Sequence, residues 1–248
     1  MAYKDKVVVV TGAGEGLGRS IALQYAMEGA KVVVADKNDK LGRETVDLIY
    51  DQRGQSIFLQ ADVTSENDVK LLMENVINCY SKIDILVNNV GMNYHKPMLE
   101  MSIDEWNDVM NVNLKSVFLC SREAAKYMKS VNTGAIINIA SSIAFKSEPD
   151  MEAYAASKGG IVSMTLSMAA SFKKYNIQVN CISPSYVESN AYERLSKIDN
   201  HDSFGFNFRK IDDVAKACIY ITLENNNFVD GSNIIINDML IRKFVNMG

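Results

Sequence analysis

A run of β-branched residues that ends in a glycine-rich turn opens this chain. Residues 6–10 read KVVVV, and a short apolar run bounded by turn residues predicts a buried strand. The segment from Thr11 to Gly18 then reads TGAGEGLG, which predicts a tight turn because glycine lacks a Cβ atom and tolerates positive φ. Apolar residues at helical spacing follow as far as Gly29, the expected end of a helix. This order predicts the first unit of an α/β fold with a parallel sheet.

Strand and helix signals alternate along the rest of the chain. Further strands are predicted at 31–35, 56–60, 84–87, 135–139, 177–182 and 232–236. Helices are predicted at 16–29, 40–52, 66–80, 103–130, 151–175 and 212–223, and Ser65 is the expected N-cap of the third helix. No internal repeat or proline-rich linker divides the 248 residues. We therefore predict one domain over residues 1–248, with helices on both faces of a buried sheet.

The composition argues against several classes of protein. The net charge of −4 does not favour nucleic acid or a membrane surface as a partner, and no apolar stretch approaches the ~20 residues of a membrane span. The first strand follows the N-terminus directly, so we expect no signal peptide. Two histidines supply a metal site poorly, and we expect no metal. Four cysteines without a C-x-x-C pair indicate reduced thiols and a cytoplasmic location.

The glycine turn is a candidate site for a dinucleotide pyrophosphate. A helix that begins near Gly16 offers unpaired N–H groups and the positive end of its dipole to an anion. The observed pattern is T-G-x-x-x-G-x-G and not the common G-x-G-x-x-G fingerprint. The pattern alone therefore leaves a glycine turn without a ligand as an alternative.

Asp36 at the end of the second predicted strand supports the nucleotide reading. It lies about 20 residues after the glycine turn, where a carboxylate can accept the ribose hydroxyls of adenosine. The same charge would repel a 2′-phosphate, and Glu15 adds a second negative charge nearby. Lys37 follows and offers a cation to a phosphate. On balance we predict NAD as the cofactor, with NADP as the less favoured alternative.

Tyr154 and Lys158 form the candidate catalytic pair. They are four residues apart in a predicted helix and therefore share one face. A nearby cation favours phenolate and lowers the tyrosine pKa, which makes the phenol a usable general acid or base. Ser142 follows the fifth predicted strand, at the sheet edge where ligands bind in such folds. Its hydroxyl can stabilise an alkoxide, whereas Ser141 is expected to point the other way along an extended chain.

These residues resemble the classical short-chain dehydrogenase/reductase family, and the resemblance spans nearly the whole chain. The shared landmarks are Thr11-Gly12-x-x-x-Gly16-x-Gly18, Asp62-Val63, Asn88-Asn89-Val90-Gly91, Asn113, Ser142 and Tyr154-x-x-x-Lys158. Together with the alternation of strands and helices, this resemblance leads us to expect a single Rossmann-type doubly wound parallel sheet of about seven strands in the order 3-2-1-4-5-6-7. The family also implies a homotetramer.

The resemblance implies a role for each landmark. Tyr154 would exchange the proton, Lys158 would hold the nicotinamide ribose and tune Tyr154, and Ser142 would orient the substrate oxygen. Asn113 would bind a water that links Lys158 to bulk solvent. The expected cofactor contacts are Thr11, Gly12, Gly16, Leu17, Gly18, Asp36, Lys37, Asp62, Val63, Asn89, Gly91, Tyr154, Lys158, Pro184, Val187 and Ser189.

The chain departs from the family pattern in several places. Ser142 lies twelve residues before Tyr154, where thirteen is usual, and counting thirteen back reaches Ser141. The usual Pro-Gly after the sixth strand is Pro184-Ser185, and Ser189 replaces the usual threonine. The serine assignment therefore rests on Ser142-Ile143-Ala144, which matches the local family pattern.

Substrate specificity is expected in three loops, because loops beside a rigid sheet commonly carry recognition. They are residues 93–97, residues 143–151 and a substrate lid at 186–209. We expect an NAD(P)-dependent oxidoreductase that interconverts an alcohol and a carbonyl. A 3-oxoacyl-thioester reductase and a sugar or polyol dehydrogenase both remain open as substrate classes. A non-catalytic NAD-binding sensor is the alternative to an enzyme.

Overall fold

The computed structural model describes residues 1–185, 211–226 and 228–236. The predicted lid at 186–209 lies outside these residues, and so do Val187 and Ser189. None of the helices described is long and apolar enough to cross a lipid bilayer.

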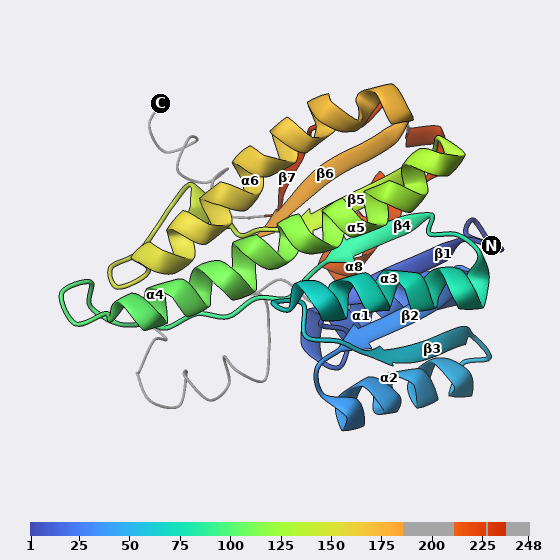
Figure 1. Cartoon of the computed structure of the whole chain (residues 1–248), viewed down its shortest axis with the longest axis horizontal. Coiled ribbons are helices and arrows are strands. Elements are labelled where there is room, and N and C mark those ends of the chain that lie inside the picture. Colours follow the sequence, from blue (N-terminus) through green and yellow to red (C-terminus); the bar gives the residue numbers. More distant parts are fainter. Residues whose placement is uncertain (186–210, 227, 237–248) are drawn as a thin grey trace, which may run out of the picture.

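A seven-stranded parallel sheet forms the centre of the fold, in the order β3-β2-β1-β4-β5-β6-β7. The strands are β1 (Val7–Thr11), β2 (Lys31–Asp36), β3 (Gln55–Gln60), β4 (Ile85–Asn88), β5 (Gly134–Ile139), β6 (Ile177–Pro184) and β7 (Asn233–Ile236). The predicted fold class and strand order are confirmed. Because all strands run in parallel, their carboxyl ends share one edge of the sheet, on the side of α4 in Figure 1.

Helices cover both faces of the sheet (Figure 1). The helices are α1 (Gly16–Met27), α2 (Asp39–Asp51), α3 (Glu66–Tyr80), α4 (Ile103–Met110), α5 (Ser116–Val131), α6 (Glu152–Phe172) and α8 (Ile211–Ile221). One layer contains α3, α5 and α6, and the other contains α1, α2 and α8. The helix α3 has the predicted bounds, and the Ser65 hydroxyl caps it by accepting from Asp68 N at 3.3 Å.

Alternate residues of each central strand supply two separate cores. In β1, Val8 and Val10 pack toward α1 and α8, whereas Val7 and Val9 pack toward α3 and α5. All five residues of β1 are buried, which explains why the strand reads as an unbroken apolar run rather than an alternating one. Burial on both faces fixes the register of the strands and therefore the positions of the residues at their ends.

The predicted helix 103–130 is helical throughout, but its middle is not α-helical. A π turn, Asn111–Lys115, joins α4 directly to α5. A π turn adds a single residue to a helix, and the apolar residues on either side of it still follow helical spacing, so the hydrophobic pattern does not reveal it. Such π turns frequently occur at functional sites, and this one contains Asn113.

Candidate active site

The glycine turn between β1 and α1 brings backbone segments into close contact. Gly12 has φ of +63° and Gly16 has φ of +54°, a conformation that glycine adopts without strain. A Cβ atom on Gly18 would lie 2.0 Å from the Gly12 carbonyl oxygen and 2.5 Å from Asn89 Nδ2. Asn89 Nδ2 in turn donates to the carbonyls of Thr11 and Gly12, each at 3.2 Å. The structure therefore brings these predicted residues together.

The helix α1 begins at Gly16 with its first N–H groups beside this turn. Glu15 precedes the helix and makes no side-chain cap hydrogen bond, so the first turn keeps donors that an anion can accept from. Leu17 is partly buried against the core on the α1 side of the sheet. Its side chain helps to anchor the helix to the core.

Asp36 faces the glycine turn from the end of β2. Its Oδ2 accepts from Gly14 N at 2.8 Å and its Oδ1 accepts from Asn38 N at 2.9 Å. The neighbouring strand β3 leads into Ala61, whose N–H donates to the Asp36 carbonyl at 3.1 Å. This contact places Asp62 and Val63 at the same sheet edge, with Val63 buried and Asp62 exposed. Lys37 is also exposed.

Lys158 lies buried beneath Tyr154 on α6. Only 3% of the residue is exposed. The ammonium Nζ donates to the Ile139 carbonyl at 3.0 Å and lies 5.5 Å from the centroid of the Tyr154 ring, within the range of a cation–π contact. Burial lowers the pKa of Lys158 from 10.5 to about 8 because a low-dielectric environment disfavours the charged form.

The pKa of Tyr154 differs from the sequence-based expectation. Burial raises it, and a hydrogen bond with Ser141 opposes the rise. The expectation that the Tyr154 pKa is lowered is therefore wrong for its net value, because the cost of burying a phenolate is the largest effect.

Ser141 faces the Tyr154 hydroxyl closely enough to lower its pKa. Ser141 has an extended backbone with φ of −163° and ψ of 153°, and its Oγ also accepts from Ile143 N at 3.2 Å. The strand β5 ends at Ile139 and a 3₁₀ turn begins at Ser142, so strand alternation does not set the direction of either serine. The expectation that Ser141 points away is wrong. Ser141 also satisfies the thirteen-residue spacing to Tyr154 without any deletion.

Asn113 connects the π turn to the neighbourhood of Lys158. Its Oδ1 accepts from Met92 N at 2.7 Å, and its Nδ2 donates to Met92 O and Ser157 Oγ, each at 2.9 Å. A Cβ atom on Gly91 would lie 3.3 Å from Lys158 Nζ and 3.6 Å from Asn113 Oδ1. Gly91, a predicted cofactor contact, therefore lies close to Lys158 and Asn113, whereas no sequence signal marked the bonds of Met92 and Ser157.

Comparison with known proteins agrees with this arrangement. A profile described as short chain dehydrogenase matches residues 6–199. The chain belongs to the short-chain dehydrogenase family. Proteins of this family are oxidoreductases that bind NAD or NADP.

Similar proteins cover nearly the whole chain. An uncharacterized oxidoreductase of Thermotoga maritima is 36% identical, over 98% of this chain and 98% of its own. The 3-oxoacyl-[acyl-carrier-protein] reductase FabG of Staphylococcus aureus is 32% identical, over 94% of this chain and 96% of its own. A structure of 7α-hydroxysteroid dehydrogenase with NADH and 7-oxo glycochenodeoxycholic acid has a TM-score of 0.88 at 29% identity, covering 95% of this chain and 94% of its own.

Two of the predicted specificity loops of this short-chain dehydrogenase lie together at the start of α6. Lys96 N donates to the Asp150 carbonyl at 3.2 Å, and Asn93 Nδ2 contacts Met151 Sδ at 3.0 Å. Pro184 ends β6 at the same edge of the sheet. The loops 93–97 and 143–151 are therefore joined beside the Tyr154 segment.

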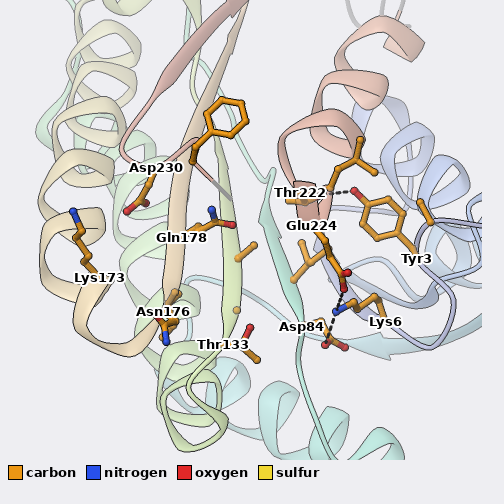
Figure 2. A pocket seen from close by; sticks show the side chains of 17 residues that line it. Tyr3, Lys6, Asp84, Thr133, Lys173, Asn176, Gln178, Thr222, Glu224 and Asp230 are labelled. Atoms are coloured by element: carbon orange, nitrogen blue, oxygen red, sulfur yellow. Dashed lines mark hydrogen bonds and ion pairs between the residues drawn. The ribbon is translucent and has the colours of Figure 1, made fainter. Parts of the chain in front are cut away.

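A separate hollow of about 690 Å³ lies at the opposite edge, where the strands begin (Figure 2). Lys6 bridges Glu224 at 3.0 Å on one wall, and the Tyr3 hydroxyl meets that of Thr222 at 2.9 Å. None of the predicted site residues lines this hollow. Within the described ranges, no three His, Cys, Asp or Glu side chains are grouped so that they could hold a metal ion.

Proposed function

We propose that this chain interconverts an alcohol and a carbonyl compound by catalysing hydride transfer between the substrate and NAD(H). The observation that carries the proposal is the grouping of Ser141, Tyr154 and Lys158 at the carboxyl end of β5, with Gly91 against the ammonium. A hydroxyl, a phenol and a cation in this arrangement can bind one oxygen atom and exchange its proton.

A nicotinamide, when bound, would supply or accept the hydride, and the side chains of the protein would hold the oxygen and exchange its proton. Tyr154 donates the proton to a carbonyl oxygen in reduction and accepts it from an alcohol in oxidation. Ser141 donates a hydrogen bond to the same oxygen, a role we transfer to it from Ser142. Lys158 stabilises the phenolate, and a positive nicotinamide ring would add to its effect. Asn113 holds the π turn beside Lys158, where the family role places a water.

The residues of the glycine turn fit a dinucleotide. The space that a Gly18 Cβ would fill is already occupied by the Gly12 carbonyl and the Asn89 side chain, so a glycine is needed there for the turn to close, and the first N–H groups of α1 are donors for a pyrophosphate. Asp36 accepts from two N–H groups with different oxygens and keeps further acceptor positions for ribose hydroxyls. Its charge and that of Glu15 would repel a 2′-phosphate, which supports NAD over NADP.

The remaining cofactor contacts are proposed as predicted from the sequence. They are Thr11, Gly12, Gly16, Leu17, Gly18, Lys37, Asp62, Val63, Asn89, Gly91, Pro184, Val187 and Ser189.

A direct activity screen would identify the substrate class. The FabG relatives support a 3-oxoacyl thioester, whereas secoisolariciresinol dehydrogenase of Forsythia intermedia, 31% identical over 94% of this chain and 88% of its own, supports a different alcohol. We propose a secondary alcohol or its ketone, tested with NAD and NADP across thioesters, sugars, polyols and cyclic alcohols. Turnover that is faster with NAD on one of these classes supports the proposal. Tight NAD binding without turnover on any of them would instead indicate a sensor.

We also propose a cytoplasmic homotetramer. All four cysteines are free, three of them buried, which is typical of a reducing compartment. The outer faces of α5 and α6 expose large apolar side chains, with Phe118 47% and Leu166 55% exposed, as expected of surfaces that pack against another subunit. Light scattering during size-exclusion chromatography tests the tetramer.

A further inference from the structure

Ser157 lies between the catalytic pair on α6 and makes two buried hydrogen bonds. The residue has no exposed surface. Its Oγ donates to the Tyr154 carbonyl at 2.8 Å and accepts from Asn113 Nδ2 at 2.9 Å. One hydroxyl thus joins the backbone of Tyr154 to the side chain in the π turn. No sequence motif singled it out.

The bonds of Asn113 extend this connection toward Lys158. Its amide also holds both the N–H and the carbonyl of Met92, and Met92 follows Gly91, which packs against Lys158 Nζ. Without the Ser157 hydroxyl, one donor of Asn113 Nδ2 would be buried and unpaired, which favours rotation of the amide. Rotation would break the Met92 bonds and release the segment that confines the ammonium.

We propose that Ser157 is a positioning residue that acts through Asn113 to hold Lys158 in place beside Tyr154. The inference rests on the proposed function, because its consequence is the proton affinity of the Tyr154 phenol. With NAD bound, a displaced ammonium stabilises the phenolate less, so the phenol holds its proton to higher pH.

The chain offers a matched control on the same helix. The Thr165 hydroxyl is also buried, donates to the Ile161 carbonyl at 2.8 Å and accepts from Asn138 Nδ2 at 2.9 Å. Ser157→Ala and Thr165→Val each remove one buried hydroxyl with one donated and one accepted bond. Only Ser157 is linked to the Tyr154 and Asn113 segments.

The first experiment measures the pKa of Tyr154 in the full chain with NAD bound. Near-ultraviolet difference titration of each protein against its Tyr154→Phe counterpart isolates this phenol from the other tyrosines. We expect Ser157→Ala to raise the pKa by about half a pH unit or more and Thr165→Val to leave it unchanged. Both variants should melt several degrees lower, because each leaves a buried donor unpaired. If Ser157→Ala does not fold, Ser157→Cys, which keeps a weaker hydrogen bond, replaces it.

A second experiment tests whether Ser157 acts through Asn113. If it does, adding Ser157→Ala to Asn113→Ala should raise the pKa of Tyr154 no further than Asn113→Ala alone. Additive effects, or a Tyr154 pKa in Ser157→Ala equal to that of the unaltered chain, would overturn the positioning role alone. Failure of the unaltered chain to bind NADH would overturn the proposed function, and this inference with it.

Discussion

Replacement of Lys158 by Met should stabilise the protein and abolish turnover. Burial lowers the pKa of Lys158 from 10.5 to about 8, which at about 1.36 kcal/mol for each pH unit corresponds to about 3 kcal/mol of cost for folding with the charge buried. Methionine has a similar length and carries no charge. It leaves the Ile139 carbonyl without its 3.0 Å bond, at a cost of about 1–2 kcal/mol. The net gain of about 1–2 kcal/mol predicts a rise of roughly 2–8 °C in Tm at pH 7.

The stabilisation expected from Lys158→Met should depend on pH, because the cost of burying the charged lysine does. Below pH 8, Lys158 is charged in the folded and unfolded states, so the full cost is present. Between pH 8 and pH 10.5 the unfolded chain binds the proton and the folded chain does not, so the stability of the unaltered protein rises with pH. By pH 10 the cost has fallen to about 1 kcal/mol, and the advantage of Lys158→Met should disappear.

Thermal unfolding at both pH values tests this prediction, with activity measured in parallel. Lys173→Met serves as the control, because Lys173 is exposed at the end of α6 and its loss should change Tm little. A Lys158→Met protein that melts below the unaltered chain at pH 7, or whose difference in Tm is the same at pH 10, would refute the reasoning.

Two further predictions concern the cofactor site. Gly18→Ala should lose several degrees of Tm and most NADH affinity, because its Cβ would lie 2.0 Å from the Gly12 oxygen and overpacking costs about 1–3 kcal/mol. Gly159→Ala is the control, because a Cβ there meets nothing within 4 Å. Its Tm should match or exceed that of the unaltered chain. Fluorescence titration with NADH and calorimetry compare the two, and equal behaviour would contradict the packing argument. Asp36→Ala should weaken NADH binding more than NADPH binding, and an unchanged ratio of the two Kd values would remove Asp36 from the proposed cofactor site.

The sheet and most helices were predictable because burial leaves a direct pattern in the sequence. The runs at β1 and at the centre of β2 are apolar because helices cover both faces. Likewise, Ser65 is followed by acidic residues in the first turn of α3, a typical start signal. These features depend on neighbours in the sequence, so local reasoning is sufficient for them.

The parts that were not predictable depend on contacts between distant segments. The π turn is accompanied by bonds from Asn113 to Met92, which apolar spacing does not encode. The direction of Ser141 depends on where β5 ends, and the expected alternation stops with the strand. The pKa of Tyr154 depends on its burial in the folded chain. Each of these corrections lies at the candidate site, where function and not packing alone constrains the residues.

Turnover by Tyr154→Phe, measured with a substrate found in the screen, tests the central claim most directly. If the phenol transfers the proton, kcat should fall by about 10²–10⁴-fold or more, while the Kd for NADH stays within about threefold because the ring is retained. A variant that binds NADH normally and keeps kcat within threefold of the unaltered enzyme would contradict the account.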